Sequence, residues 1–323
     1  MKQYLEAVRT ILENGYRKEN RTGVDTISTF GVHYNIDLQQ GFPLLTTKYI
    51  NWKNIVVEML WFLSGQTDIS ILKKHGCKFW DNWADENGKV PSAYGNFWRQ
   101  FPVHGDDADP DVGHGLVVKE FNDQIKFVVD TLKKDPMSRR MVVSAWAPGN
   151  AQTSKLPPCH CTFVVNVQNV EGLERVPGGG GVLMPLTEQR LCLHLTQRSC
   201  DMALGVPYNI ASYALLMHLL SRFSQHSSRC EGIPVGTFSH TLVDAHAYTC
   251  KPDGAKAEFD HVPGLREQLT REPRRLPRLT ISDEIKTLED VEKLIDCDTA
   301  EVMRHFVLDG YDPHPAIKFA PAV

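Results

Sequence analysis

The sequence predicts an α+β protein. Its strand-like and helical segments do not alternate in a regular βαβ order, which argues against a doubly wound parallel sheet. Of the 323 residues, 42% are hydrophobic and 23% are charged, values typical of soluble globular proteins and not of disordered or disulfide-stapled chains. No segment is poor enough in apolar residues to act as a linker. We therefore expect a single domain that spans residues 1–323.

Local patterns predict the individual elements. Apolar residues recur at helical spacing over residues 2–14, and Gly15 then ends the helix. Residues 54–65 form a helix that is apolar nearly all round, which places it in the interior or at an interface. Strand-like runs, the first of them bent and broken at Gly31, and a second strongly apolar helix complete the set. The strand-like runs are residues 26–38, 141–146, 162–167, 191–195 and 237–243, and the helix is residues 210–223.

Three stretches are predicted to be loop insertions, and they lie near residues 101–122, 171–187 and 224–235. The middle stretch contains four consecutive glycines at residues 178–181. A phosphate-binding glycine loop must connect a strand to the amino terminus of a helix. These glycines lie between two strand-like runs, so we interpret them as an insertion loop.

Charge and cysteine content narrow the classes of partner. The net charge of −4 gives no reason to expect nucleic acid or an anionic membrane. No apolar run reaches the roughly 18 residues of a membrane span, and the first residues lack a signal core, so we expect a cytoplasmic protein.

Eight cysteines are too few for a disulfide framework, and Cys159-His160-Cys161 lacks the second ligand pair of a zinc site. We expect no metal.

Glu58 is the first residue whose place in the sequence needs a chemical explanation. It is the single carboxylate within the apolar run of residues 55–63. Burying an ionised group without a partner costs several kcal/mol. Glu58 is therefore either a paired structural residue or a general acid/base whose proton affinity burial has raised.

Cys159 follows Pro157 and Pro158, which stiffen the backbone and would present the next side chain in a fixed direction. That geometry suits a nucleophile, although a cysteine entering an apolar strand is also an ordinary core residue. A nearby guanidinium would favour the thiolate, and Arg198 is the candidate. Arg21, Arg139, Arg140 and Arg198 could also converge on one phosphate, or be separate surface charges.

Two further patterns are compatible with a ligand site. Residues 244–248 place Asp, His and Tyr at every second position, on one face of a strand. Trp80 and Trp83 could stack on a flat heterocycle, or simply pack in the core. Neither pattern decides the function alone.

Together these segments closely resemble the thymidylate synthase family. The resemblance runs from residue 1 to about residue 101 and resumes at residue 135, and only the three predicted insertions fall outside it. So many ordered motifs are far more specific than one short pattern. They are Arg21-Thr22-Gly23, residues 41–48, residues 58–63, Trp80-Asp81-Asn82-Trp83, residues 135–140, Leu156-Pro157-Pro158-Cys159-His160-Cys161, Gln197-Arg198-Ser199-Cys200-Asp201, residues 204–213, residues 244–248 and residues 310–315.

The resemblance implies a fold of bent mixed or antiparallel sheets packed with helices, and a homodimer joined sheet to sheet. It implies transfer of a one-carbon unit from 5,10-methylenetetrahydrofolate to carbon 5 of dUMP through a covalent Cys159 adduct. Reductive methylation to dTMP is the expected outcome, with dUMP and reduced folate as the small-molecule partners. An asparagine at position 209 implies uracil, because its amide can pair with both a carbonyl and an N–H.

The resemblance also implies roles for individual residues. The catalytic residues would be Glu58, Tyr94, Cys159, Arg198, Asp201 and Asn209. The dUMP-binding residues would be Arg21, Arg139, Arg140, His160, Gln197, Ser199, His246 and Tyr248, with Arg139 and Arg140 contributed by the partner subunit. The folate-binding residues would be Phe79, Trp80, Trp83, Leu156, Asp201, Gly205, Tyr208 and Val323.

One departure from the family pattern keeps an alternative open. Before Tyr94 the family usually has a proline and a valine, whereas this chain has Ser92 and Ala93. The added hydroxyl and the lost bulk could admit a water, which would quench the methylene intermediate and give 5-hydroxymethyl-dUMP. A catalytically silent nucleotide- or messenger-binding module is the third hypothesis. The presence of Cys159 and Glu58 argues against it.

Overall fold

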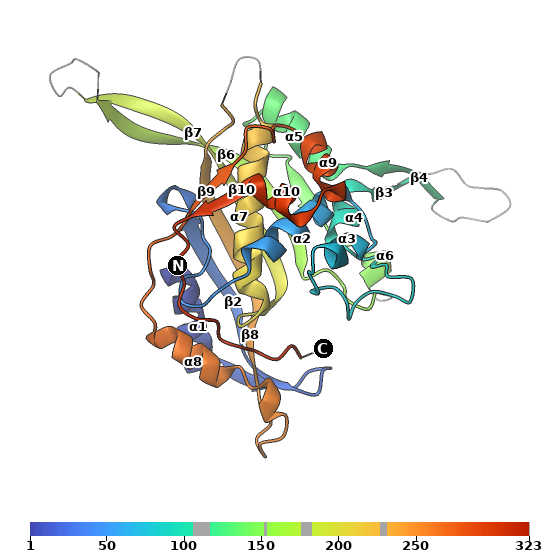
Figure 1. The fold of residues 1–323 in the computed structure, drawn as a ribbon, viewed down its shortest axis with the longest axis vertical. Helices are drawn as coiled ribbons and strands as arrows, with labels where there is room; N and C mark the ends of the chain where they lie inside the picture. The colour runs from blue at the N-terminus through green and yellow to red at the C-terminus, as the bar shows by residue number, and fades with distance from the viewer. Residues whose placement is uncertain (106–116, 152–153, 176–182, 227–230, 323) are drawn as a thin grey trace.

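A mixed six-stranded sheet forms the centre of the molecule (Figure 1). The computed structural model describes residues 1–105, 117–151, 154–175, 183–226 and 231–322. The strand order is β1-β2-β8-β7-β6-β5, in which β7 and β8 are parallel and the other neighbours are antiparallel. The α+β prediction is confirmed. The strands are β1 (Tyr16–Lys18), β2 (Asp25–Asp37), β5 (Val142–Ser144), β6 (His160–Arg175), β7 (Leu183–Asp201) and β8 (Val235–Thr249).

Helices cover one face of this sheet. Helix α7 (Gly205–Phe223) links the parallel strands β7 and β8 and packs on both. Helix α2 (Trp52–Ser64) packs against α7, and α1 (Lys2–Asn14) lies against β2. The side chains of β7 alternate accordingly, since residues 191, 193 and 195 are buried whereas residues 192, 194 and 196 are only partly buried. The second set lies on the opposite face of the sheet.

The predicted helices are present, with one difference in how they end. Helix α2 stops at Gly65, whose φ of 71° is in the left-handed region that favours glycine. Gly15, after α1, has φ −75°, which any residue adopts. Glycine is required there for space, because a Cβ atom would collide with the Ile11 carbonyl oxygen.

Two of the predicted loop insertions are wrong in their described parts. The first contains the antiparallel pair β3 (Phe101–Gly105) and β4 (Val117–Asn122). In the second, β6 and β7 stay paired as far as Arg175 and Leu183. These hairpin arms extend away from the body of the molecule (Figure 1), so neither needs the apolar alternation that reveals a half-buried strand. The glycine tract 178–181 lies outside the described residues.

Smaller elements surround this centre. Helix α4 (Tyr94–Arg99) packs against α2 and brings Tyr94 toward the sheet. No helix of the described chain is long and apolar enough to cross a membrane. The remaining elements are α3 (Ser70–Lys74), α5 (Gln124–Lys134), α6 (Pro148–Ala151), α8 (Val262–Thr270), α9 (Leu288–Lys293), α10 (Thr299–Arg304), β9 (Arg278–Ile281), β10 (Phe306–Asp309) and the 3₁₀ turns Leu38–Gln40, Ala257–Phe259 and Leu294–Asp296.

Candidate active site

A pocket of about 400 Å³ collects many of the residues singled out from the sequence. Its walls come from the turn between β1 and β2, the segment before β6, and the carboxyl-terminal ends of β7 and β8. Segments more than 200 residues apart therefore share one cavity. The predicted residues that line it are Arg21, Leu156, Cys159, Arg198, Ser199, His246 and Tyr248.

The segment that carries Cys159 is held from two sides. The backbone N–H of Cys159 donates to the Tyr94 hydroxyl at 3.0 Å. Arg198 donates from Nε to the Pro158 carbonyl at 3.0 Å and from Nη2 to the Pro157 carbonyl at 2.6 Å. Its own backbone N–H donates to the Cys159 carbonyl at 2.8 Å. The rigid approach predicted from the two prolines is thus reinforced by an arginine that binds both of their carbonyls.

Two opposing effects act on the Cys159 thiol. Burial raises its pKa above the ordinary value, and the positive charge of Arg198 acts in the opposite direction, helped by Tyr94 and Arg21. The predicted proximity of Arg198 is correct, but burial outweighs the effect of the guanidinium on the pKa. Formation of the thiolate therefore depends on these arginines remaining close to the sulfur.

Glu58 has both a partner and a perturbed pKa. Its side chain in α2 is buried, and Oε1 accepts a hydrogen bond from Trp80 Nε1 at 2.7 Å. Burial raises the pKa of Glu58 to about 7, although the hydrogen bond from Trp80 opposes this shift. A carboxyl group with a pKa near neutrality can both donate and accept a proton, as general acid–base catalysis requires.

Only two of the four predicted phosphate arginines meet in this chain. Arg21 and Arg198 both line the pocket. Arg21 lies in a turn organised by Asn20, whose Oδ1 accepts from the Thr22 backbone N–H at 2.9 Å. The other two, residues 139 and 140, are exposed and do not line this pocket.

The predicted period-two pattern in β8 is correct. Asp244, His246 and Tyr248 all line the pocket, whereas Ala245 and Ala247 are fully buried on the other face. The rings of His246 and Tyr248 meet edge to face, with centroids 5.4 Å apart. The parallel register sets Asp244 and His246 opposite residues 199 and 201 of β7, so the two strands present their polar residues together.

Three polar side chains lie deeper, beside the cysteine. His160 is buried and stacks on Tyr94 with ring centroids 4.5 Å apart. Burial lowers its pKa to about 4, and a hydrogen bond with Asn209 opposes this shift. Gln197 is also buried, and its Nε2 donates to Asn209 Oδ1 at 3.0 Å. Neutral hydrogen-bonding groups thus dominate this end of the site.

Four of the predicted folate residues, Phe79, Asp201, Gly205 and Tyr208, lie around the start of α7. Phe79 is 36% exposed and meets Tyr208 edge to face, with centroids 4.9 Å apart. Gly205 is the first residue of α7, and a Cβ atom there would lie 3.5 Å from Asn209 Oδ1, an ordinary contact. An exposed aromatic edge beside a helix start can accommodate a flat ring. Val323 lies outside the described residues.

Asp201 ends β7 next to this aromatic group. Burial raises its pKa, but His261, His246 and the hydrogen bond from the Ala203 N–H outweigh burial, so its pKa is lower than usual. The bond from Ala203 N to Asp201 Oδ1 is 2.8 Å long, and His261 Nδ1 is 3.8 Å from the same oxygen. Asp201 is thus a carboxylate at neutral pH and can accept hydrogen bonds from a ligand.

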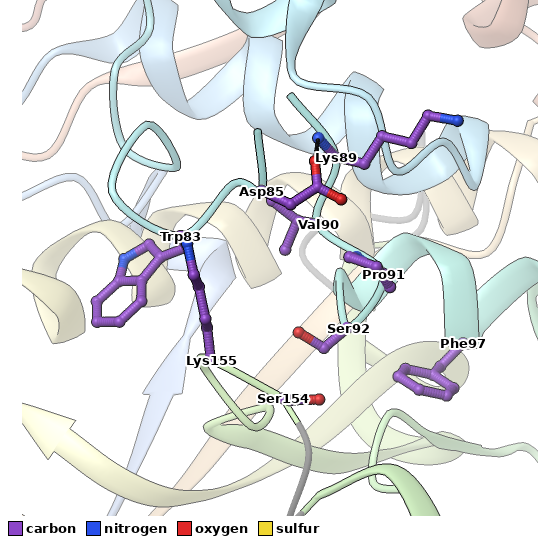
Figure 2. Close-up of a pocket in the computed structure, with 9 residues that line it drawn as sticks. All are labelled: Trp83, Asp85, Lys89, Val90, Pro91, Ser92, Phe97, Ser154 and Lys155. Carbon is purple, nitrogen blue, oxygen red and sulfur yellow. Dashed lines mark hydrogen bonds between the residues drawn. The ribbon is translucent and has the colours of Figure 1, made fainter. Parts of the chain in front are cut away.

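A second pocket of about 340 Å³ adjoins the first and shares Ser154 and Lys155 with it (Figure 2). Trp83 and Lys155 stand together on one side of it, and Ser92 on the other. Ser92 Oγ donates to the Leu156 carbonyl at 3.2 Å. The hydroxyl that distinguishes this chain from the usual family pattern thus binds the segment leading to the cysteine.

Several pocket residues were not among the predicted site residues. Lys18 Nζ lies 2.7 Å from Asp244 Oδ2, which closes one wall with an ion pair. Its sequence signal is weak, because a lysine in a short exposed strand resembles any surface charge. Among the described residues, no group of three or more His, Cys, Asp or Glu side chains could hold a metal ion. The other unpredicted lining residues are Asn20, Thr22, Thr26, Ala151, Ser154, Lys155 and Pro157.

Comparison with known proteins identifies the family. The family model described as thymidylate synthase matches residues 2–323. A curated thymidylate synthase of Haloferax volcanii is 39% identical, and the match covers 98% of this chain and 95% of that protein. Both findings support methylene transfer from 5,10-methylenetetrahydrofolate to dUMP with formation of dTMP, and neither favours the hydroxymethylated product. The chain therefore belongs to the thymidylate synthase family.

Proposed function

We propose that the pocket holding Cys159 and Arg198 is where this chain methylates dUMP, and that residues 1–323 act as one catalytic domain. The observation that carries the proposal is the fixed cysteine segment. Its thiol faces a cavity that two arginines also line, and Arg198 binds the backbone on both sides of that segment. A positioned nucleophile beside an anion site suits a phosphorylated pyrimidine.

In this proposal the Cys159 sulfur adds to carbon 6 of the uracil, which makes carbon 5 nucleophilic. Arg21 and Arg198 bind the phosphate of dUMP, and Ser199, which follows Arg198 in β7, lines the same cavity. His246 and Tyr248 face the same cavity and bind the sugar hydroxyl. The nucleotide is thereby held along the ends of β7 and β8.

Glu58 and Tyr94 serve proton transfer. A carboxyl group with a pKa of about 7 can exchange protons with the pyrimidine during the reaction, directly or through water. Tyr94 binds the cysteine backbone and stacks on His160, so it connects the nucleophile to the buried polar groups. Asn209 and Gln197 lie beside His160 and bind the base.

The residues around α7 fit a flat, nitrogen-rich ring. Phe79 and Tyr208 offer aromatic surface, Asp201 offers a carboxylate for N–H donors, and Trp80 forms the inner wall against Glu58. Trp83, Leu156 and Gly205 complete this surface. When bound there, methylenetetrahydrofolate supplies the one-carbon unit and the hydride.

We also propose that the active enzyme is a homodimer joined through the uncovered face of the sheet. Arg139 and Arg140 are exposed, and the flanking Met137 and Val142 are each 47% exposed in the single chain. Exposed apolar residues beside arginines that do not line the pocket of their own chain are typical of an interface between subunits. Across a twofold axis both arginines would reach the partner's phosphate site.

Loss of the nucleophile tests the chemistry. We expect Cys159→Ala to lose more than about 10³-fold in turnover of dUMP with methylenetetrahydrofolate, followed by the absorbance of dihydrofolate. Cys161→Ala, two residues away, is the matched control and should keep most of the activity. Turnover retained by Cys159→Ala would exclude the covalent mechanism. Mass spectrometry of the nucleotide product separates dTMP from 5-hydroxymethyl-dUMP.

Mixing two inactive variants tests the dimer. Cys159→Ala and Arg140→Glu subunits, unfolded and refolded together, should recover about one quarter of the wild-type activity, because half of the dimers then contain one intact site. A mixture of Cys159→Ala with Arg198→Ala should recover nothing, since both residues belong to the same chain's site. No recovery in the first mixture would contradict the shared site.

A further inference from the structure

A buried chain of hydrogen bonds leads from the middle of the sheet to Asn209. The Tyr34 hydroxyl lies 2.9 Å from His240 Nδ1, and His240 Nε2 lies 3.1 Å from Gln197 Oε1. Gln197 Nε2 then donates to Asn209 Oδ1 at 3.0 Å. Tyr34, His240 and Gln197 are all buried, and His240 has no exposed surface. None of the functions described above uses Tyr34 or His240.

One backbone carbonyl determines the direction of every bond in this chain. Gln197 Nε2 also donates to the Ser199 carbonyl at 3.1 Å, and a carbonyl can only accept. The amide of Gln197 therefore has its nitrogen toward Ser199 and Asn209 and its oxygen toward His240. The facing Nε2 of His240 must then carry the proton, so Nδ1 accepts and the Tyr34 hydroxyl donates.

The same logic sets the amide of Asn209. Because Gln197 presents an N–H to it, the atom that faces Gln197 must be the oxygen. The Asn209 nitrogen is then the donor available to a ligand, and Oδ1 is the acceptor beside it. The hydrogen bond with His160 raises the pKa of that ring, as an acceptor does, so it also falls on Oδ1 and favours the same orientation. The protein thus holds Asn209 in one of its two amide orientations.

This orientation discriminates between pyrimidines. Uracil presents a carbonyl at carbon 4 and an N–H at nitrogen 3, whereas cytosine presents an amino group and a bare nitrogen. A donor–acceptor pair with fixed direction matches uracil and opposes cytosine at both positions, and a flipped amide would reverse the preference. A free asparagine could flip at little cost, so a support that prevents the flip contributes to specificity.

We propose that His240 and Tyr34 are positioning residues for base selection, which act through Gln197 to keep the Asn209 amide in the orientation that accepts uracil. The proposal rests on the proposed function, because it requires Asn209 to bind the base. Burial lowers the pKa of His240 well below its usual value, which keeps the ring neutral with one donor and one acceptor nitrogen. A protonated ring could not accept from Tyr34.

The test compares the affinities for dUMP and dCMP, measured by titration calorimetry, in four variants. His240→Leu removes the donor to Gln197, and the ratio of the dCMP to the dUMP dissociation constant should fall about tenfold. His240→Gln places an N–H near the position of Nε2, and the ratio should recover to within about twofold of wild type. Tyr34→Phe removes only the first bond, and the ratio should fall about threefold.

Tyr4→Phe is the matched control. Tyr4 is also fully buried, and its hydroxyl donates to the Met202 carbonyl at 2.6 Å, outside the chain that leads to Asn209. Its loss should lower thermal stability as much as Tyr34→Phe does, without changing the affinity ratio. A merely structural role for His240 would likewise lower stability and weaken both nucleotides equally.

The outcomes separate this inference from the proposed function. An unchanged ratio in folded Tyr34→Phe and His240→Leu, with wild-type enzyme still forming dTMP, would overturn the positioning role alone. Wild-type protein that binds neither nucleotide and forms no dTMP would overturn the proposed function itself. A ratio that falls in both variants and recovers in His240→Gln supports the inference.

Discussion

Burial acts to raise the pKa of two carboxylates of the proposed site, but their net pKa shifts have opposite signs. Glu58, within α2, has one neutral donor, Trp80, and its pKa rises to about 7. Asp201, at the end of β7, accepts from the Ala203 N–H and lies near His261, and its pKa falls below the usual value although burial acts to raise it. Burial is the largest single cause for both groups, so the number and charge of the neighbouring donors decide the sign of the net shift.

This difference separates two tasks. A carboxyl group that titrates near neutrality can move protons, whereas one that stays ionised is a permanent acceptor. The following predictions test this assignment, in order of decreasing effect.

Removing the titrating carboxyl has the largest expected effect. Glu58→Gln keeps the shape and an acceptor for Trp80 but cannot exchange a proton, so kcat should fall about 10²- to 10⁴-fold. The pH dependence of kcat should lose its inflection near pH 7. The assay is the formation of dihydrofolate at several pH values. Glu6→Gln, on the exposed side of α1, is the control, and a kcat equal to its value would exclude Glu58 from catalysis.

The pH dependence of stability is the next effect. The folded-state pKa of Glu58, about 7, exceeds its ordinary value of 4.5. The contribution of Glu58 to the free energy of unfolding is therefore fully present below pH 4.5. It is lost as the pH rises through 7, by on the order of 3 kcal/mol. Urea unfolding at pH 5 and pH 8 measures the loss, which Glu58→Gln should remove. An identical loss in wild type and variant would show that Glu58 is not its source.

Asp201→Asn tests the carboxylate that stays ionised. The amide removes the charge and presents an N–H where a ligand donor is expected, so kcat/KM for the folate should fall about tenfold or more. The dissociation constant for dUMP alone should change much less. Steady-state kinetics and calorimetry separate the two effects. Equal losses for both ligands would argue against a folate-side role.

Trp80→Phe has the smallest expected effect, and it tests the donor to Glu58 alone. It removes the donor that restrains the pKa of Glu58, so the inflection of the pH–rate profile should move to higher pH. Trp52→Phe is the matched control, because that indole, in the same helix as Glu58, donates to the Phe306 carbonyl at 2.9 Å instead. It should lower stability and leave the inflection in place. A profile that moves in both variants would indicate a general effect of packing.

The apolar part of the fold could be predicted from local pattern. The helical spacing over residues 2–14 coincides with α1, and the apolar run near residue 58 coincides with α2. The hairpin arms were missed because they extend away from the body of the molecule and lack the apolar alternation of a half-buried strand. The amphipathic helix α5 (Gln124–Lys134) was not predicted either, although its buried residues recur at helical spacing in the sequence.

For the site, the sequence indicated which residue types carry chemistry and offered Arg198 as the neighbour of Cys159, but it did not give the hydrogen-bond partners. Glu58 stood out as a single carboxylate in an apolar run, and Cys159 because two prolines precede it. Arg198 was singled out as a guanidinium that could favour the thiolate. The bonds of Arg198 to both proline carbonyls, and the chain from Tyr34 to Asn209, depend on strand register and on contacts over long sequence separations. Residues 139 and 140 cannot be placed in a site by one chain alone.

The parallel pair β7 and β8, with α7 crossing between them, has a mechanical consequence. Asp201 ends β7 and Gly205 begins α7, so only three residues separate the strand proposed to hold the nucleotide from the helix turn proposed to hold the folate. A displacement of either support is transmitted to the other through this short corner. We therefore expect the affinity for either ligand to depend on whether the other is bound, by the same factor in both directions.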